Sequence, residues 1–550
     1  MEEKNIELST YLFNKEDISK LSSAKFNNYP VVYILHNDKK KSSAYIGETV
    51  QIRNRLNSHI KDPVKSNLNT AVIVSHEHFN QSATYNIETN LINYFIADQK
   101  YQILNKSQIT SSVTHNYYDK PKYNHDIFKE LWEKLRADKL VDGTLEYLQN
   151  KDIFKISPYK ELSEPQIELK ESILEFCKKN IDSDKPAVYF IKGEAGTGKS
   201  VVLSSTFNAV QDLANDKESE RLYGSENHLL VNHQEMIKTY EAISESLPNL
   251  KKKNFLKPTT FINRVNDGKM KSDITFVDEA HLLLSREDAY NSYKGENHLS
   301  DIINSSKVSI IVFDEKQFLK LKSYWTEDLF KQITKDAKVE TFELTDQFRI
   351  QADDSVVDWI DNFVDKKITP IPSNTGDYEL KIFENAGEMF KEIEQKDKKH
   401  TLSRIVATFD YEHKKDGADY YVEEIGFKGI WNTTNDKRTW AERAETINEV
   451  GSIYTIQGFD LNYVGVILGP SVSFNEETGE LEILTQNYKD TEAFRSSSKQ
   501  TVEYNVGETK EQIILNSINV LMKRGVKGLY IYASDEKLRK ALDKAKRGEV

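Results

Sequence analysis

Eight residues of the sequence, GEAGTGKS at 193–200, have the composition and spacing of a loop that binds phosphate. Glycine lets backbone N–H groups converge on phosphate oxygens, and a helix that begins at the end of such a loop adds the positive end of its dipole. The loop lies between the apolar runs VYFI and VVL, which is the strand–loop–helix order that this site requires. Lys199 would neutralise the β- and γ-phosphates, and Ser200 would bind Mg²⁺. The residues expected in this site are Gly193, Gly196, Gly198, Lys199 and Ser200.

Two acidic residues follow a later apolar run, in ITFVDEAH at 274–281. At the tip of a strand, Asp278 can hold Mg²⁺ through water, and Glu279 can polarise an attacking water molecule as a general base. The alternative is a strand followed by an acidic helix N-terminus, which the helix dipole also favours. Because the motif lies downstream of a phosphate loop, we expect the two motifs to form one site that hydrolyses a nucleotide.

The N-terminal part of the chain carries a second set of residues suited to chemistry. Tyr33 and Tyr45 lie on two neighbouring strand-like runs, VVYIL and AYIG. Arg55 and His59 are four residues apart, so a helix would place them on one face. Glu88 falls in a later helix-like segment, YNIETNLINYF. Each residue alone also fits a core or surface role, but two phenols, an arginine, a histidine and a carboxylate together are the groups that phosphodiester hydrolysis needs.

The elements that must position the phosphate loop are strands of a parallel sheet. Seven short apolar runs have the length and composition of buried strands, and long polar, helix-compatible stretches separate them. These runs are 188-VYFI, 229-LLV, 274-ITFV, 308-VSIIVF, 404-RIVATF, 464-VGVIL and 528-GLYIYA. The pattern predicts α/β architecture, with helices covering both faces of parallel sheets.

The first part of the chain differs and predicts a small α+β unit. Its expected elements are the paired runs 31-VVYIL and 44-AYIG, a helix at about 50–61, a strand at 71–74 and a helix at about 84–97. Residues 106–124 are polar and irregular and indicate a linker. In IFKELWEKL at 127–135, apolar residues at helical spacing predict a bridging helix that Trp132 packs in place.

Composition and charge limit the classes of function. The chain has 75 Lys and Arg against 87 Asp and Glu, a formal net charge of −12, so it is not a protein that coats nucleic acid nonspecifically. Any nucleic-acid site must be a local groove, and the charge leaves a homo-oligomer open. The one cysteine, Cys177, rules out an intramolecular disulfide and a cysteine-based zinc site. No apolar run approaches the roughly 20 residues that span a bilayer, and no signal or transit peptide is recognised, so we expect a cytoplasmic protein that does not bind membranes.

The motifs from about residue 160 onward resemble the core of a superfamily 1 helicase, most closely the Schlafen group 3-like DNA/RNA helicase family. The resemblance is carried by GEAGTGKS, VDEAH, VFDEKQ, LTDQFR, IYTIQGFD with LNYVGVILG, WNTTNDKRTW and NVLMKRGVKGLYIY. It implies two RecA-like lobes with ATP bound between them. One departure is Asp460, where related enzymes often have glutamate.

The same resemblance implies roles for residues outside the two nucleotide motifs. Gln317 would couple the γ-phosphate to the site that binds the nucleic-acid strand. Arg349 and Arg524 would act as arginine fingers from opposite sides of the cleft, although an arginine at a helix end can also simply compensate the helix dipole. Gln457 and Gly458 would lie at the interface between the lobes.

Gln166 has two interpretations. In helicases of this kind a glutamine upstream of the phosphate loop contacts adenine. In SEPQ, however, Ser163 and Gln166 also have the spacing of a capping box, in which Gln166 closes the first turn of a helix. Both interpretations predict that a helix begins here.

Residues 28–107 resemble a GIY-YIG nuclease domain. Tyr33 matches the tyrosine of the first motif, although VVY stands in place of GIY, and Tyr45 opens an intact YIG motif. Arg55, His59, Glu88 and Asn105 fall where the family has its catalytic arginine, histidine, metal-binding glutamate and late asparagine. The resemblance implies that Glu88 binds Mg²⁺ or Mn²⁺, that Arg55 contacts the scissile phosphate, and that Tyr33 or His59 assists the attacking water.

The sequence therefore predicts an α/β chain in which a small α+β GIY-YIG domain precedes two RecA-like parallel-sheet lobes. The expected divisions are an N-terminal segment at 1–27, the nuclease domain at 28–107, a linker and bridging helix at 108–160, lobe 1 at 161–335 and lobe 2 at 336–550.

These domains together predict an ATP-dependent nuclease–helicase that acts on nucleic acid, with DNA as the expected substrate. The motor would control access to the nuclease, and the pairing of domains suggests bacterial anti-phage defence. The alternatives are a nuclease of DNA repair or recombination, a nucleotide-sensing switch that does not translocate, and an RNA-directed nuclease. The sequence identifies no protein partner.

Overall fold

The computed structural model describes most of the 550-residue chain. The described residues are 6–21, 27–38, 42–106, 117–193, 196–285, 287, 293–314, 327–344, 354–414, 416–433, 440–441, 443–456, 460–494 and 506–549. Four predicted site residues, Gln317, Arg349, Gln457 and Gly458, lie outside the described residues, so their roles stay predictions.

The chain divides into two compact units. The first comprises Met1–Tyr189, Ser200–Asp278 and Ile303–Ile311, and the second comprises Phe190–Lys199, Glu279–Ile302 and Val312–Val550. The phosphate loop passes from one unit to the other between Lys199 and Ser200, and the VDEAH motif does so between Asp278 and Glu279. Each motif therefore contributes residues to both units.

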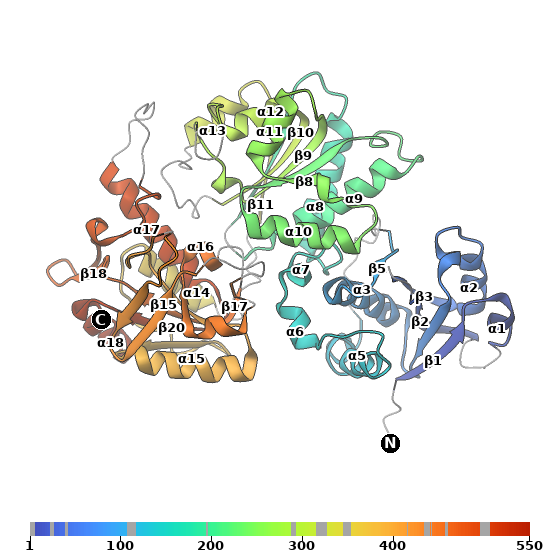
Figure 1. Cartoon of the computed structure of the whole chain (residues 1–550), viewed down its shortest axis with the longest axis horizontal. Helices are drawn as coiled ribbons and strands as arrows, with labels where there is room; N and C mark the ends of the chain where they lie inside the picture. Colours follow the sequence, from blue (N-terminus) through green and yellow to red (C-terminus); the bar gives the residue numbers. More distant parts are fainter. Residues whose placement is uncertain are drawn as a thin grey trace. The chain divides into compact units, whose positions relative to one another are not determined.

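A five-stranded sheet of order β1-β4-β2-β3-β5 forms the N-terminal part of the first unit (Figure 1). Its strands are β1 (Glu7–Leu12), β2 (Asn27–His36), β3 (Ser43–Gln51), β4 (Thr70–Ser75) and β5 (Gln102–Ile103), and its helices are α1 (Lys15–Ser19), α2 (Ile52–Ile60) and α3 (Gln81–Asp98). Helix α3 packs across β2 and β3, whose inward residues are buried. This confirms the predicted α+β unit, to which the structure adds β1, a strand that the sequence did not predict.

A group of short helices follows this sheet. They are α4 (Lys120–Lys122), the π-helical turn η3 (Tyr123–Ile127), α5 (Phe128–Ala137), α6 (Leu145–Asn150) and α7 (Asp152–Lys155). The predicted bridging helix is confirmed as α5, and the helical turns before it begin within the predicted linker. Trp132 is fully buried, its ring lies 5.2 Å from that of Tyr94 on α3, and its Nε1–H donates to Gly143 O at 2.9 Å. The indole therefore joins α5 to the N-terminal sheet.

A six-stranded sheet of order β11-β6-β10-β9-β7-β8 carries the phosphate loop. Its strands are β6 (Ala187–Gly193), β7 (Asn227–Val231), β8 (Phe255–Leu256), β9 (Ser272–Asp278), β10 (Ser306–Phe313) and β11 (Lys338–Leu344). Its helices are α8 (Glu164–Asn180), α9 (Lys199–Asn215), α10 (Gln234–Ser246), α11 (Pro258–Asn266), α12 (His298–Asn304) and α13 (Glu327–Thr334). Strand β9 pairs in parallel with β10 and β7, and these three strands are almost wholly buried, which is the expected result for a sheet covered on both faces.

A seven-stranded sheet of order β12-β20-β17-β13-β16-β15-β14 follows in the second unit. Its strands are β12 (Glu379–Phe383), β13 (Ser403–Ala407), β14 (Tyr421–Glu424), β15 (Phe427–Trp431), β16 (Glu449–Gly451), β17 (Leu461–Leu468) and β20 (Gly525–Ala533), and β18 (Val472–Asn475) pairs with β19 (Glu480–Ile483). Its helices are α14 (Asp354–Val364), α15 (Ala386–His400), α16 (Ile453–Ile456), α17 (Val506–Met522) and α18 (Glu536–Arg547). Neighbouring strands of this sheet pair in parallel, except that β14 pairs with β15 in antiparallel. All seven predicted strands and both RecA-like parallel sheets are thus confirmed.

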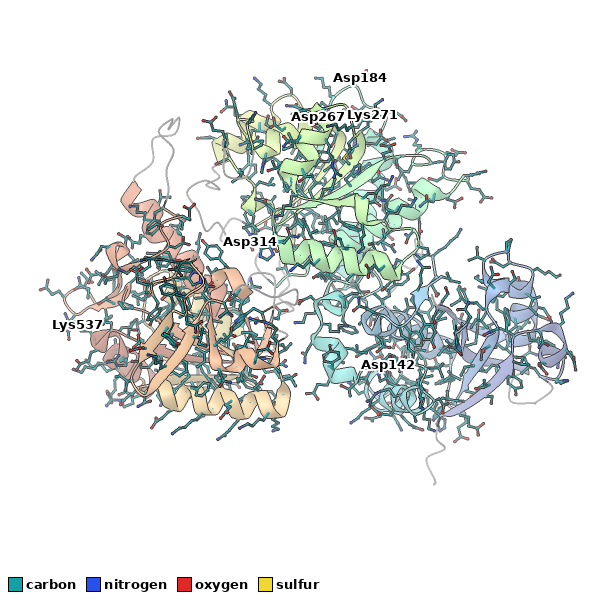
Figure 2. All side chains as sticks on the ribbon, viewed as in Figure 1. Asp142, Asp184, Asp267, Lys271, Asp314 and Lys537 are labelled. Carbon is teal, nitrogen blue, oxygen red and sulfur yellow. The ribbon has the colours of Figure 1, made fainter. Side chains whose placement is uncertain are left out.

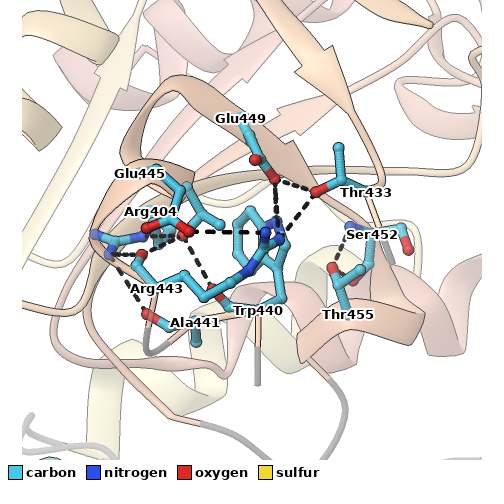
Figure 3. A network of polar contacts seen from close by, with 10 residues as sticks. Arg404, Thr433, Trp440, Ala441, Arg443, Glu445, Glu449, Ser452 and Thr455 are labelled. Carbon is cyan, nitrogen blue, oxygen red and sulfur yellow. Dashed lines mark hydrogen bonds and ion pairs between the residues drawn. The ribbon is translucent and has the colours of Figure 1, made fainter. Parts of the chain in front are cut away.

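Two buried arginines, Arg404 and Arg443, join described residues that lie between β15 and β16 to the sheet (Figure 3). Arg404 on β13 donates from Nη2 to Arg443 O at 2.9 Å and from Nη1 to Asp397 Oδ1 at 2.6 Å. Glu449 at the start of β16 accepts from Trp440 Nε1 at 2.8 Å and from Arg443 Nη2 at 3.4 Å. Because charged groups are seldom fully buried unless they are paired, this network ties Trp440 and Arg443 firmly to the sheet.

None of the helices in the described part of the chain combines the length and the hydropathy of a membrane span.

Candidate functional site

Tyr33 and Gly47 face each other across the first hairpin of the N-terminal sheet. The antiparallel register of β2 and β3 pairs these two residues directly. A Cβ atom added to Gly47 would lie 2.3 Å from Tyr33 Oη and 2.5 Å from its Cζ atom, closer than van der Waals contact permits. The glycine of the AYIG run therefore provides the space that the Tyr33 phenol occupies.

Helix α2 brings Arg55 and His59 to the Tyr33 hydroxyl. Arg55 Nε–H donates to Tyr33 Oη at 3.3 Å, and His59 Nε2 lies 2.8 Å from the same oxygen. The rings of Tyr45 and His59 meet edge to face, with centroids 4.9 Å apart. Burial raises the pKa of Tyr33, and the Arg55 charge opposes that rise. The predicted face of α2 is thus confirmed, and its two side chains converge on one phenol.

Lys65 decides which nitrogen of His59 carries the proton. Its Nζ atom lies 3.3 Å from His59 Nδ1, 3.9 Å from the centre of the Tyr45 ring, and 3.5 Å from Asp62 Oδ2. An ammonium group has donors only, so Nδ1 must accept, and Nε2 then carries the hydrogen that it donates to Tyr33. Burial first, and then the charges of Lys65 and Arg55, lower the pKa of His59 to about 4. His59 is therefore a neutral hydrogen-bond donor to Tyr33.

Two carboxylates, those of Glu88 and Glu48, are close enough for the charge of one to act on the other. Burial first, and then the negative charge of Glu48, raise the pKa of Glu88 to about 8, while the charge of Arg55 opposes the rise. The backbone N–H of Glu48 also opposes the rise in the pKa of Glu88, and Thr84 Oγ1 on α3 donates to Glu48 Oε2 at 3.3 Å. Within the described ranges no cluster of three or more His, Cys, Asp or Glu could hold a metal. One or two carboxylates that leave room for water and a phosphate oxygen suit Mg²⁺ nonetheless, so Glu88 and Glu48 fit such an ion.

Asn105 binds the backbone of β3 next to the tyrosine motif. Its Oδ1 accepts the N–H of Ile46 at 3.0 Å, and its Nδ2 donates to Ile46 O at 2.7 Å. The side-chain amide of Asn105 thus pairs with the backbone of Ile46 as a peptide group of a neighbouring strand would, just beyond the end of β5. This contact holds Tyr45 and Gly47 in place, while the catalytic role expected for Asn105 stays a prediction.

In the first unit, the hydroxyl of Ser200 lies against Asp278. Ser200 Oγ donates to Asp278 Oδ1 at 3.1 Å, and Tyr240 Oη on α10 donates to Asp278 Oδ2 at 2.7 Å. Asp278 ends β9 and is fully buried. A hydroxyl and a carboxylate oxygen at this separation match the ligands that Mg²⁺ prefers, so the pair that the sequence predicted fits that ion. The sequence did not identify Tyr240.

In the second unit, Lys199 closes the glycine loop. Gly196 and Gly198 have φ angles of +94° and +79°, which L-residues with side chains rarely adopt. Lys199 Nζ donates to Gly193 O at 2.6 Å and pairs with Asp314 Oδ2 at 3.3 Å (Asp314 is labelled in Figure 2). The ammonium group is thereby held at the loop, where it can meet an incoming phosphate.

Glu279 has a strained backbone and an ionised side chain. Its φ and ψ of 51° and 48° are left-handed, a conformation that costs energy for any residue other than glycine. Burial would raise the pKa of the Glu279 carboxyl, but His281 Nε2 at 3.0 Å from Oε2, together with Lys199 and Arg524, holds that pKa well below its usual range. An ionised carboxylate beside a phosphate loop has the protonation state that a general base needs.

Arg524 is buried just beyond the end of α17. Its Nη1 atom lies 3.9 Å from Asp460 Oδ1, and its charge reaches Glu279. The structure therefore pairs Arg524 with the aspartate that departs from the family pattern, and the arginine charge helps to keep Glu279 ionised. Its arginine-finger role stays a prediction.

Gln166 caps helix α8. Its Oε1 accepts the backbone N–H of Ser163 at 3.1 Å, and Gln166 is buried. The capping box is confirmed. Contact between Gln166 and adenine stays a prediction.

Models of two protein families match separate parts of this chain. Residues 186–535 match the model of the Schlafen group 3, DNA/RNA helicase domain, which is more than half of the chain. The chain belongs to this family. Residues 29–102 match the GIY-YIG catalytic domain, which confirms the expected resemblance of the N-terminal sheet.

One relative is the uncharacterized protein YPL245W of Saccharomyces cerevisiae. It is 40% identical over 413 residues, which cover 69% of this chain and 90% of that protein.

Two similar solved structures are helicase-type proteins. The Pif1 helicase from Candida albicans has 12% identity and a TM-score of 0.29, covering 70% of this chain and 99% of that one. A DEAD box protein from Methanococcus jannaschii has 12% identity and a TM-score of 0.30, covering 75% and 96%. Likenesses this low carry no argument about function.

Proposed function

We propose that the chain is a metal-dependent nuclease whose cleavage of nucleic acid is controlled by an ATP-driven motor in the same chain. The nuclease and helicase families to which its parts belong support action on nucleic acid. ATP dependence, the metal and DNA as the substrate are the further steps of the proposal.

The observation that carries the nuclease is the convergence of Arg55 and His59 on the Tyr33 hydroxyl. Arg55 would stabilise the charge that develops on the scissile phosphate. Because both ring nitrogens of His59 are engaged, by Tyr33 and by Lys65, His59 would orient the phenol rather than take a proton from water. Tyr33 is then the favoured group to face the attacking water.

A divalent ion at Glu88, with Glu48 beside it, would supply charge neutralisation and a polarised water. Mg²⁺ is the expected ion, with Mn²⁺ as the alternative, since both bind carboxylate oxygen. Below the pKa of Glu88, near 8, a proton competes with the ion for that carboxylate.

The motor half of the proposal rests on the residues of the phosphate loop. Lys199 would neutralise the phosphates of ATP, Ser200 and Asp278 would hold Mg²⁺, and Glu279 would orient the attacking water. Gln166 would contact adenine, and Arg524 would respond to the γ-phosphate. Closing and opening of two RecA-like lobes would move or gate the nucleic-acid strand.

The pairing of a nuclease with a motor favours anti-phage defence as the biological setting, although the yeast origin of the similar protein adds no support for a bacterial role. Incision during DNA repair uses the same chemistry. A preference for branched over plain duplex DNA would favour repair.

Cleavage of matched DNA and RNA tests the nuclease directly. Fluorescent DNA and RNA of one sequence, single- and double-stranded, would be incubated with the full chain and Mg²⁺. We expect DNA cleavage that Glu88→Gln lowers by at least about 100-fold, because the neutral amide keeps the shape and loses the metal-binding charge. Glu133→Gln, an exposed position on α5, is the matched control and should cut normally. Cleavage of RNA alone would replace DNA as the substrate, and no cleavage of either would refute the nuclease.

A further inference from the structure

A buried tyrosine lies between the nuclease strand and the helix that follows the phosphate loop. Tyr159 belongs to the first unit, as do β3 and the part of α9 from Ser200 onward, and its side chain is almost fully buried. Its hydroxyl donates to Asn105 O at 2.9 Å, and the side chain of Asn208 lies close enough to the phenol to oppose the rise in its pKa. Burial raises its pKa, and the nearby negative charges of Asp212 and Glu88 raise it further, so the phenol remains a donor.

On one side, Tyr159 reaches the tyrosine motif through a single residue. Asn105 accepts the Tyr159 hydroxyl with its backbone carbonyl and binds both backbone groups of Ile46 with its side chain. Ile46 stands between Tyr45 and Gly47, the glycine that makes room for Tyr33. A displacement of Tyr159 would therefore act on the strand that shapes the nuclease site.

On the other side, Tyr159 lies near α9, whose Asn208 and Asp212 both act on the pKa of its phenol. This helix begins at Lys199, and Asn208 lies eight residues beyond Ser200, about 12 Å along the helix axis. Asn208 is itself fixed, because Asn249 Nδ2 donates to its Oδ1 at 2.7 Å. Because successive turns of α9 are hydrogen-bonded to one another, the helix moves as one body, and a shift at its phosphate-binding end also shifts Asn208.

We propose that Tyr159 is a positioning residue that couples the nucleotide state of the phosphate loop to the geometry of the nuclease strand. This inference rests on the proposed function and adds to it the physical route by which the motor controls the nuclease. The route runs from Ser200 along α9 to Asn208, through the Tyr159 hydroxyl to Asn105, and into β3 at Ile46. It needs no contact across the two units, because every residue in it belongs to the first.

Removing one hydroxyl separates coupling from simple packing. Tyr159→Phe keeps the ring and breaks both ends of the link. Tyr378→Phe is the matched control, because the Tyr378 hydroxyl is equally buried and donates to a backbone carbonyl, Gly525 O, at 3.3 Å. Asn208→Ala breaks the link from its other end and takes the place of Tyr159→Phe should that variant not fold.

The first measurement is the ratio of cleavage rates with and without ATP in the full chain. In the wild type we expect this ratio to differ from one by about fivefold or more, the lower range of typical coupling between sites. In Tyr159→Phe it should fall to near one, as in Lys199→Ala, while Tyr378→Phe should keep the wild-type ratio. A wild-type ratio in Tyr159→Phe would overturn the proposal.

The second measurement does not depend on cleavage. Hydrogen exchange would be followed in peptides spanning 44–50 and 102–106, with and without a non-hydrolysable ATP analogue and Mg²⁺. The nucleotide should change the protection of these peptides in the wild type but not in Tyr159→Phe, at equal occupancy of the nucleotide site. No change in the wild type would refute the coupling, and the same change in both proteins would refute the role of Tyr159. If neither DNA nor RNA is cut, the proposed function fails while this experiment still decides the link.

Discussion

Replacing Lys65 by methionine should raise the pKa of His59. Methionine keeps the length of the side chain and removes the ammonium group that lies 3.3 Å from His59 Nδ1. Without that donor and its charge, protonation of the imidazole is less costly, and Nδ1 loses the partner that fixes the tautomer. The buried state of His59 and the charge of Arg55 remain, so its pKa should stay below that of a free histidine.

The size of the shift follows from the distance. Two unit charges 3.3 Å apart interact by about 1.3 kcal/mol in a water-like dielectric and by about 5 kcal/mol at an effective dielectric of 20. The whole depression, from 6.5 to about 4, is shared by three causes of which burial is the largest, so the smaller figure applies. At roughly 1.4 kcal/mol per pKa unit, we expect Lys65→Met to raise the pKa of His59 by about one unit.

Histidine NMR measures this shift on the full chain. Comparison with His59→Gln assigns the His59 signals among the 12 histidines, and ¹⁵N shifts across a pH series give both the pKa and the tautomer. The wild type should show the Nε2–H tautomer, and Lys65→Arg, which keeps charge and donors, should retain the low pKa. An unchanged pKa in Lys65→Met, or an Nδ1–H tautomer in the wild type, would refute the role assigned to Lys65.

Three further predictions test other parts of the structure. Gly47→Ala places a methyl group 2.3 Å from Tyr33 Oη, so it should displace the phenol. We expect this variant to lose cleavage in a gel assay and to have a free energy of unfolding lower by about 1–3 kcal/mol. Full cleavage would contradict the packing of Tyr33 against Gly47. Burial lowers the pKa of His228 to about 4, so this histidine binds a proton more readily in the unfolded chain than in the folded chain. The urea midpoint of the wild type relative to that of His228→Gln should therefore fall as the pH drops from 7 to 5, and an unchanged difference between the two proteins would contradict this. Glu279→Gln should lower ATP hydrolysis by about 100-fold or more and preserve binding of a fluorescent ATP analogue, whereas retained hydrolysis would exclude Glu279 as the base.

Much of the fold followed from local patterns. Short apolar runs between helix-compatible stretches are typical of a parallel sheet that helices cover on both faces. All seven strands predicted in this way are present in the structure. The pairing of Arg55 with His59 on one helix face was also predictable, because a four-residue spacing fixes relative direction in a helix. Gln166 as a helix cap followed from the capping-box spacing.

The residues that the sequence did not identify act through long-range contacts. Lys65 lies on a short 3₁₀ turn beyond the end of α2, so no helical period links it to His59. Tyr240 reaches Asp278 across 38 residues, and Tyr159 reaches Asn105 across 54. Such partners are set by the packing of helices on sheets rather than by local pattern, and a buried tyrosine in sequence is indistinguishable from a core residue.

Glu48 is the one missed residue with a local signal. It directly follows the AYIG run, and a carboxylate beside the motif that carries Tyr45 could have been paired in advance with Glu88. Strand β1 was missed because its run, ELSTYL, has neither a strict alternation of polar and apolar residues nor the sustained apolar character of the other strands.

Control of the nuclease by the motor is tested most directly by cleavage of a supercoiled plasmid with Mg²⁺, with and without ATP. Wild type, Glu88→Ala and Lys199→Ala would be compared at equal concentration, with ATP hydrolysis recorded in parallel. We predict that Glu88→Ala abolishes cutting while ATP hydrolysis persists, and that Lys199→Ala abolishes hydrolysis and removes the effect of ATP on cutting. Motor control would be contradicted if the wild type cuts the plasmid and neither ATP nor Lys199→Ala alters that cutting. A DNA nuclease would be contradicted if no cutting occurs under any nucleotide condition while Lys199-dependent ATP hydrolysis is intact.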